Sequence, residues 1–168
     1  KPIVTSHVTE DKVEQVYSFL KKQIALGRQA YVVYPVIEES ETLAMKAAQK
    51  MHQHLSQLVF PDLEVGLLHG RMPAADKEGA MNRFQRGLTK ILVSTTVIEV
   101  GVDVPNASVM VIEQAERFGL AQMHQLRGRV GRGAEQSYCV LVTAKMNELA
   151  RERIRTLVES TDGFYIAE

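Results

Sequence analysis

The chain has 168 residues, of which 45% are hydrophobic and 24% are charged, as is ordinary for one globular domain. Twenty basic residues balance twenty acidic ones, so bulk charge gives no argument for or against nucleic acid, and any basic site must be local. The single cysteine, Cys139, excludes an internal disulfide and fits a reducing cytoplasm. No apolar run approaches the roughly 18 residues that a membrane helix needs, and no signal peptide opens the sequence, so we expect no membrane segment.

Apolar runs and helical periodicities alternate along the whole sequence. In chain order they predict a strand at 1–6, a helix at 10–26, a strand at 30–34, a helix at 42–59, a strand at 65–68, a helix at 73–85, strands at 90–94 and 108–112, a helix at 120–126, a strand at 138–142 and a helix at 146–159. This alternation is typical of α/β proteins with helices on both faces of a parallel sheet. We therefore expect a three-layer fold with a mainly parallel sheet of about six strands.

Three polar segments follow predicted strands, at 69–71, 95–96 and 113–119. Ligands of open parallel sheets lie beyond the carboxyl ends of the strands. We therefore expect these segments to share one edge of the sheet.

Residues 125–133 read Gln-Leu-Arg-Gly-Arg-Val-Gly-Arg-Gly. Arginine is a charged fork that matches phosphate oxygens, and glycine lets a backbone pass close to a ligand. Arg129 and Arg132 are three residues apart, so on one helical turn they would point to the same side. Two converging guanidinium groups would stabilise charge on a transferring phosphoryl group, and Gln125, one turn earlier, could position water or a phosphate oxygen.

A simpler interpretation of the arginines stays open from composition alone. They could form a solvated basic loop, or they could pair with Glu113, Glu116 or Glu135.

A second segment, 94–105, reads Ser-Thr-Thr-Val-Ile-Glu-Val-Gly-Val-Asp-Val-Pro. With the arginine segment, its spacing resembles motifs V and VI in the second motor domain of superfamily 2 helicases. The likeness is closer still to the RecG-type branched-DNA helicases, and it covers nearly the whole chain. The segments that carry this closer likeness are 37–40, 97–107, 118–122 and 162–164. The transcription-repair coupling translocases are similar at Gly-Leu-Ala-Gln and at the arginine motif, but differ in motifs IV and V.

The resemblance implies a RecA-like, P-loop NTPase-like fold and an ATP-dependent motor that acts on branched DNA in recombination and replication-fork repair. Arg129 and Arg132 would reach across a cleft to the phosphates of ATP, with Gln125 beside them. The ATP and its Mg²⁺ would be held mainly by the amino-terminal motor domain of the same polypeptide. Gly101 and Asp103 would also lie at the nucleotide.

The resemblance places further residues at DNA. Thr95 and Thr96 would contact the DNA backbone, and Glu99 would link the DNA side to the ATP side. Three residues after a strand would approach the phosphodiester track: His69, Gly70 and Arg71. Structural roles are open for the same positions, because the threonines could cap the turn after their strand, the histidine could be a satisfied strand-end residue and Arg71 a solvated loop charge.

The sequence contains no Gly-x-x-x-x-Gly-Lys-Ser/Thr loop and no acidic Asp-Glu box, which supply the phosphate cradle and the magnesium ligand of such ATPases. We therefore expect half of a composite active site, inactive by itself. Residues 1–145 would be the motor domain, and 146–168 the start of a truncated helical hairpin involved in translocation.

Three other interpretations of the sequence compete with this one. The chain could be the equivalent domain of a transcription-repair coupling translocase, or a non-catalytic RecA-like DNA-binding module. A dinucleotide enzyme is disfavoured, because no Gly-x-Gly-x-x-Gly follows the first strand. The resemblance places the protein in the bacterial cytoplasm, associated with the nucleoid.

Overall fold

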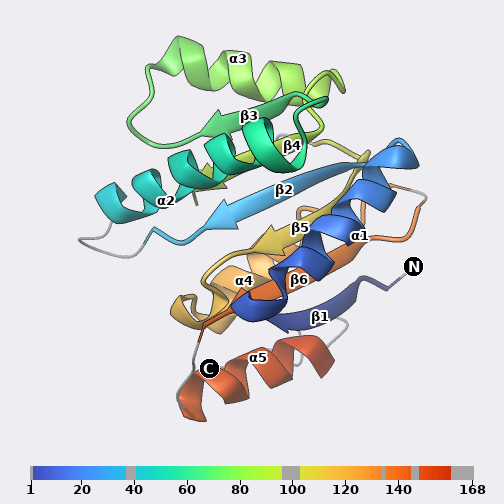
Figure 1. Cartoon of the computed structure of the whole chain (residues 1–168). Helices are drawn as coiled ribbons and strands as arrows, with labels where there is room; N and C mark the ends of the chain where they lie inside the picture. Colours follow the sequence, from blue (N-terminus) through green and yellow to red (C-terminus); the bar gives the residue numbers. More distant parts are fainter. Residues whose placement is uncertain (1, 37–40, 96–102, 134, 145–147, 160–168) are drawn as a thin grey trace.

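A computed structural model of the chain describes residues 2–36, 41–95, 103–133, 135–144 and 148–159. One sheet of six parallel strands runs through it in the order β1-β6-β5-β2-β4-β3 (Figure 1). The strands are β1 (Val4–Thr9), β2 (Gln29–Tyr34), β3 (Val65–Leu68), β4 (Ile91–Thr95), β5 (Ala107–Ile112) and β6 (Tyr138–Thr143). The expected parallel sheet is confirmed.

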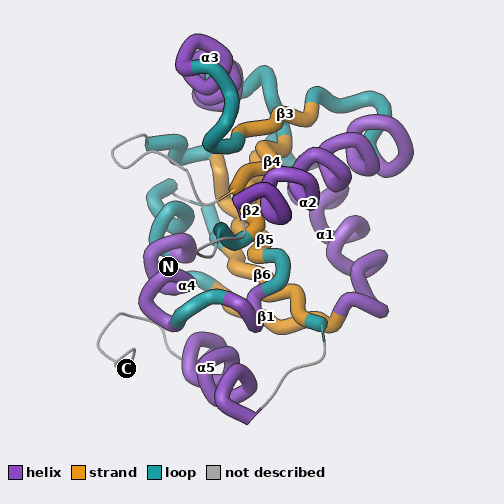
Figure 2. Tube along the Cα trace, turned by 90° about the vertical axis from the view of Figure 1, so that its left-hand side faces the viewer, coloured by secondary structure: helices purple, strands orange, loops and turns teal. Residues whose placement is uncertain are grey.

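Helices cover both faces of this sheet (Figure 2). They are α1 (Val13–Ala25), α2 (Glu41–His54), α3 (Ala74–Gln85), α4 (Leu120–Arg127) and α5 (Glu148–Glu159), with short turns η1 (Glu10–Lys12), η2 (Leu55–Val59) and η3 (Ala115–Arg117). The core under α1 and α2 is separate from the core under α3, α4 and α5. The expected three-layer fold is therefore confirmed. No helix among the described residues is long and apolar enough to cross a membrane.

The central strand β2 shows why the sheet forms where it does. All six of its residues are buried, and successive side chains alternate between the two faces. Val32 and Tyr34 pack under α1 and α2, whereas Tyr31 and Val33 pack under α3 and α4. A continuous apolar run is what a parallel strand covered on both faces requires.

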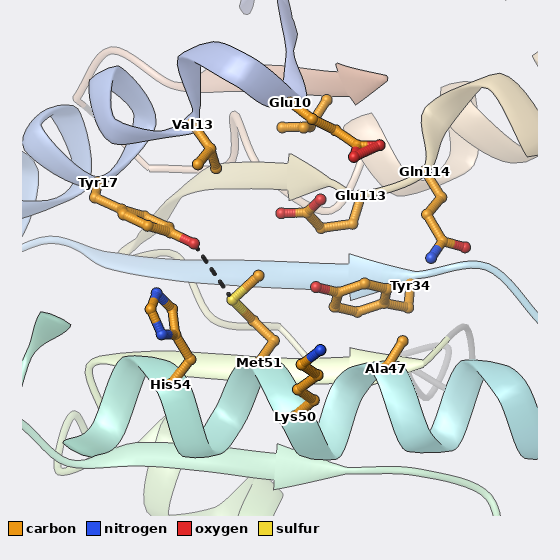
Figure 3. Close-up of a pocket in the computed structure, with 11 residues that line it drawn as sticks. Glu10, Val13, Tyr17, Tyr34, Ala47, Lys50, Met51, His54, Glu113 and Gln114 are labelled. Carbon is orange, nitrogen blue, oxygen red and sulfur yellow. Dashed lines mark hydrogen bonds between the residues drawn. The ribbon is translucent and has the colours of Figure 1, made fainter. Parts of the chain in front are cut away.

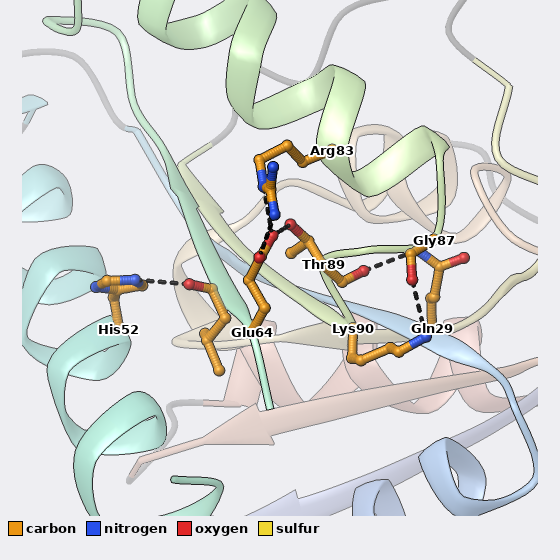
Figure 4. Close-up of polar contacts among 8 residues, drawn as sticks. Gln29, His52, Glu64, Arg83, Gly87, Thr89 and Lys90 are labelled. Atoms are coloured by element: carbon orange, nitrogen blue, oxygen red, sulfur yellow. Dashed lines mark hydrogen bonds and ion pairs between the residues drawn. The ribbon is translucent and has the colours of Figure 1, made fainter. Parts of the chain in front are cut away.

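Polar contacts fix α3 against the amino edge of the sheet (Figure 4). Glu64, just before β3, accepts two hydrogen bonds from the guanidinium of Arg83, at 2.6 and 2.8 Å, and one from Thr89. The amide of Gln29 donates to the carbonyl oxygens of Phe84 and Thr89 at 2.7 and 2.9 Å. These bonds hold the end of α3 and the start of β4 to β2.

Helix α5 packs on the same core as α4, through Ile154 and Leu157. The described part of the carboxyl-terminal region is thus joined to the sheet. A separate translocation role for residues 146–168 remains a prediction.

Candidate functional site

Polar residues gather at the carboxyl edge of the sheet, as expected. The register pairs Leu68 of β3 with Ser94 of β4, so His69 and Thr95 come next to each other at adjacent strand ends. Glu113 follows the end of β5. Strand β5 is parallel to β3 and β4 in the same sheet, and β2 lies between β5 and β4. The three segments therefore share one edge.

His69 is largely buried, with 8% of its surface exposed. Its Nδ1 accepts a hydrogen bond from the backbone N–H of Arg71 at 3.2 Å, which leaves Nε2 to carry the proton. Burial lowers the pKa of His69, and the nearby cations Lys77 and Arg71 lower it further. A neutral imidazole near pH 7 would meet a phosphate oxygen through its Nε2–H rather than as an ion pair.

Arg71 is exposed and points back to the start of α2. Its Nη2 donates to the hydroxyl of Thr42 at 2.6 Å, and its Nε lies 4.0 Å from a carboxylate oxygen of Glu41. Gly70 is half-buried in the turn between His69 and Arg71. The guanidinium is therefore oriented by α2 and keeps other donors for a ligand.

Thr95 is 1% exposed, and its hydroxyl has no hydrogen-bond partner among the described residues. In this conformation the side chain ends a buried strand, so a contact with DNA needs a local change that uncovers it. Thr96, Glu99 and Gly101 lie outside the described residues.

Asp103 lies at the other end of the sheet from Thr95. Tyr34 of β2 pairs with Thr95, and Gln29 of β2 pairs with Ala107, which follows Asp103 by one turn. At about 3.3 Å per residue, the two ends of β2 are roughly 17 Å apart. The expected DNA contacts and the expected nucleotide contacts therefore occupy two different regions.

The arginine segment leaves the helix sooner than its spacing suggests. Helix α4 ends at Arg127, Val130 is buried, and Gly131 has a φ of +86°. Arg129 and Arg132 therefore do not share a helical turn. A left-handed residue, which favours glycine, separates them.

The fold nevertheless holds Arg132 beside Asp103. Nη1 of Arg132 lies 3.9 Å from Oδ1 of Asp103, and Nε of Arg132 donates to the carbonyl of Gly128 at 3.3 Å. Burial raises the pKa of Tyr31 to about 12, while the charges of Arg129, Asp103 and Arg132 all act on its phenol. The three charged side chains are thus close enough to Tyr31 for each of them to act on the pKa of its phenol.

A close backbone contact joins the arginine segment to the segment of Asp103. A Cβ on Gly133 would stand 2.6 Å from the carbonyl oxygen of Pro105, a distance that real Cβ atoms do not adopt. The N–H of Gly131 donates to the hydroxyl of Ser137 at 2.9 Å. Glycine at 133 is therefore needed for the approach that places Arg132 beside Asp103.

The other contacts considered from the sequence are not found among the described residues. Gln125 is exposed on α4 and makes no hydrogen bond with another described residue through its side chain. The alternative in which the arginines pair with Glu113, Glu116 or Glu135 has no support in the described part of the chain, where Arg132 pairs with Asp103 instead.

Arg127 was not singled out by the sequence, although it belongs to the arginine motif. It is 3% exposed, and its Nη1 donates to the carbonyl of Leu157 at 2.9 Å and to the hydroxyl of Thr5 at 3.3 Å. It therefore ties α4 to α5 and β1. The sequence carried one indication that Arg127 is buried. It follows the apolar Met123 by four residues and so lies on the same, buried face of α4.

Arg129, Arg132 and Asp103 are the described residues that the resemblance assigns to the nucleotide. The side chains of Arg132 and Asp103 are 56% and 53% exposed, which leaves both open to a ligand from outside the chain. Among the described residues, no three His, Cys, Asp or Glu side chains are grouped as metal ligands.

The chain is similar to known proteins in sequence. Residues 11–134 match the family model described as helicase conserved C-terminal domain. The chain is 55% identical over its whole length to the ATP-dependent DNA helicase RecG of Synechocystis sp., and 53% identical to that of Thermotoga maritima. It covers 20% and 22% of these two relatives, so it spans about a fifth of their length.

The chain is also similar to solved structures of helicases. A structure of RecG bound to a three-way DNA junction matches 99% of this chain and 21% of that one, with a TM-score of 0.83 and 49% identity. Domain 2 of the DEAD-box helicase Mss116p, bound to an RNA duplex, matches 94% of this chain and 61% of that one, with a TM-score of 0.71. Its identity of 22% supports the fold alone.

Proposed function

The chain belongs to the helicase conserved C-terminal domain family, and from that premise we propose that it is the second motor domain of an ATP-dependent helicase acting on branched DNA. The observation that carries the proposal is the exposed Arg132 held beside Asp103, with Arg129 near the same point. Identity of about one half to RecG proteins over the whole chain favours the RecG type over a transcription-repair coupling translocase.

The arginines would act as fingers on a nucleotide bound elsewhere. An amino-terminal motor domain would supply the phosphate cradle, and ATP bound there with Mg²⁺ supplies the phosphoryl group. Closure of the cleft would bring Arg132 and Arg129 to the β- and γ-phosphates, where their fixed charge stabilises the transition state. Asp103 would hold the guanidinium of Arg132 in place before closure, and Gln125 and Gly101 would line the same cleft.

The DNA contacts would lie at the opposite end of β2. His69, Gly70 and Arg71 would meet phosphate oxygens, which carry no sequence information and suit a motor that walks on any sequence. Thr95, Thr96 and Glu99 belong to the segment that leads from this edge toward Asp103. One stretch of chain would thus join the DNA side to the ATP side. A protein with this role works where the DNA is, which in a bacterium is the nucleoid within the cytoplasm.

A reconstitution experiment tests the proposal against a non-catalytic DNA-binding module. The chain alone is expected to hydrolyse no ATP, with or without a forked duplex. Adding the separately purified amino-terminal motor domain of a closely similar RecG should give DNA-stimulated hydrolysis that is lost with Arg132→Ala. Turnover by the chain alone would contradict the proposal, and so would stimulation that survives both Arg129→Ala and Arg132→Ala.

A further inference from the structure

A cavity of about 400 Å³ opens at the carboxyl edge of the sheet, on the face covered by α1 and α2 (Figure 3). Tyr34 at the end of β2 and Glu113 after β5 line it from the sheet, while Tyr17 and Met51 line it from the two helices. Its volume falls in the range of ligand-binding sites. Arg132 and Asp103 lie on the other face, so this cavity is separate from the proposed ATP site.

Two largely buried residues of the cavity carry polar groups that have no partner among the described residues. Glu113 is 8% exposed and Tyr34 is 5% exposed. Neither the carboxylate of Glu113 nor the phenol of Tyr34 makes a hydrogen bond or ion pair with another described residue. Among the described residues, the fully buried side-chain atoms without a partner belong to Thr95 and Arg153, so the oxygens of Glu113 and Tyr34 keep some exposure and can meet a ligand inside the cavity.

Two carboxyl groups and one ammonium group, those of Glu10, Glu113 and Lys50, line the cavity. The carboxylate of Glu10 lines it together with Glu113, and Glu116 is close enough to act on Glu113 electrostatically. Lys50 and His54 of α2 also line it, but neither lies within 4.0 Å of a carboxylate oxygen of the described residues. A positively charged ligand therefore has unpaired carboxylates to meet.

We propose that this cavity binds the guanidinium group of an arginine side chain presented by a polypeptide segment outside this chain. A guanidinium offers five N–H donors in a planar fork, which matches the carboxylate of Glu113, the phenolic oxygen of Tyr34 and the amide oxygen of Gln114. The apolar stem of arginine suits Val13 and Met51, which contribute apolar surface to the walls.

The choice of arginine from a polypeptide follows from the chemistry of the walls. A guanidinium is more weakly hydrated than an ammonium group, and it packs well against aromatic rings such as those of Tyr17 and Tyr34. Most of the length of the RecG relatives lies outside the region that this chain matches, which makes such a segment available in proteins of this kind.

The shifted pKa of Glu113 agrees with this assignment. Burial raises the pKa of Glu113 to about 7, and the carboxylates of Glu10 and Glu116 raise it further. The other titratable groups that line the cavity are Tyr17 of α1, Tyr34 of β2, and Lys50 and His54 of α2. A bound guanidinium would keep Glu113 ionised and displace its proton, so binding should tighten between pH 6 and pH 8.

Titration of the 168-residue chain with blocked tripeptides, followed by amide NMR shifts, tests the proposal. The probe carries arginine between two glycines, and matched probes carry lysine or citrulline, the neutral isostere of arginine. The arginine peptide is expected to shift the amides of Tyr34, Met51 and Gln114 and to bind at least fivefold more tightly than either matched probe. Equal binding of the citrulline peptide, or no shift at these amides, would overturn the proposal.

Variants keep the test specific to the cavity. Glu113→Gln should weaken the arginine peptide at least tenfold, as should Ala47→Leu, which fills the cavity from α2 and leaves both carboxylates in place. The control Glu135→Gln removes one exposed carboxylate at the amino edge and should leave the affinity unchanged. Unchanged affinity in both cavity variants would overturn the proposal, and so would tighter binding of spermidine, which would assign the cavity to a free polyamine. ATP hydrolysis does not enter these readouts.

Discussion

Nη1 of Arg132 lies 3.9 Å from Oδ1 of Asp103, at the opposite end of β2 from Thr95. Asp103 and Thr95 bound the stretch of chain that matches motif V of the superfamily 2 helicases. Asp103 lies at the proposed ATP site, and Thr95 lies at the strand end nearest the proposed DNA track. The two proposed regions are thus separated by about the length of one strand.

Replacing Arg127 should destabilise the fold, because its removal leaves the carbonyl of Leu157 without its donor in a buried place. Arg127→Ala is expected to lower the free energy of unfolding by about 2 to 4 kcal/mol in urea denaturation. Arg127→Met, which keeps much of the stem volume, should recover part of that loss. The exposed Arg151→Ala on α5 is the control and should stay within about 0.5 kcal/mol of the parent. An Arg127→Ala chain as stable as this control would show that the buried hydrogen bonds contribute nothing.

Glu64 should make stability depend on pH in the acid range. Hydrogen bonds from Arg83 and Thr89 lower its pKa to about 2 from an ordinary value of 4.5. A lowered pKa means a contribution that is present above pH 4.5 and is lost as the pH falls toward 2. Glu64→Gln should therefore cost stability at pH 6, by about 0.2 to 1 kcal/mol because the pair is partly exposed, and cost little near pH 2.

Thermal unfolding of Glu64→Gln between pH 2 and pH 6 measures this difference. The matched control is Glu152→Gln, which removes the exposed carboxylate paired with Arg155 on α5. A Glu64→Gln cost that is the same at both ends of the range would show that the Arg83 contact does not depend on the ionised carboxylate.

Glu113 should have the opposite dependence. Its pKa is raised from 4.5 to about 7, so its contribution is fully present below pH 4.5 and is lost as the pH rises through 7. The uncharged Glu113→Gln chain should match the parent near pH 4.5 and exceed its stability at pH 8, by on the order of a few kcal/mol. Denaturant unfolding at the two pH values, with Glu135→Gln as the control, measures the effect. A pH-independent difference would mean that Glu113 titrates normally.

The sheet could be predicted from the sequence because its central strands are unbroken apolar runs. The run at 30–34 lies within β2, where both faces are buried, and such a run has few other stable arrangements in an alternating α/β chain. The carboxyl-edge location of His69 and Thr95 followed from the same topology.

The geometry around Arg132 could not be predicted from periodicity. Spacing treats Arg129 and Arg132 as neighbours on a helix, but α4 ends at Arg127 and Gly131 turns the chain in the left-handed region. The approach of Gly133 to Pro105 depends on two segments far apart in sequence, which local patterns do not relate. The resemblance to helicases implied that the arginines and Asp103 lie at one nucleotide, whereas the ion pair of Arg132 with Asp103 comes from the fold.

The burial of Glu113 could not be predicted from the sequence either. Glu113 follows an apolar strand and looks like the first residue of a solvent-exposed loop. Glu113 lies in a cavity between η1 and α1 on one side and α2 on the other (Figure 3). Packing between elements distant in sequence decides such cases.

ATP turnover by the intact protein at saturating forked DNA tests the central claim most directly. Arg132→Ala should reduce kcat by about 10³- to 10⁵-fold, the usual contribution of an arginine finger, while DNA binding stays unchanged because Arg132 lies away from the DNA edge. Arg86→Ala, which removes an exposed arginine at the end of α3, should retain full activity. An Arg132→Ala protein that keeps more than about a tenth of the parent rate would contradict the finger role, because a finger contributes about 10³-fold or more.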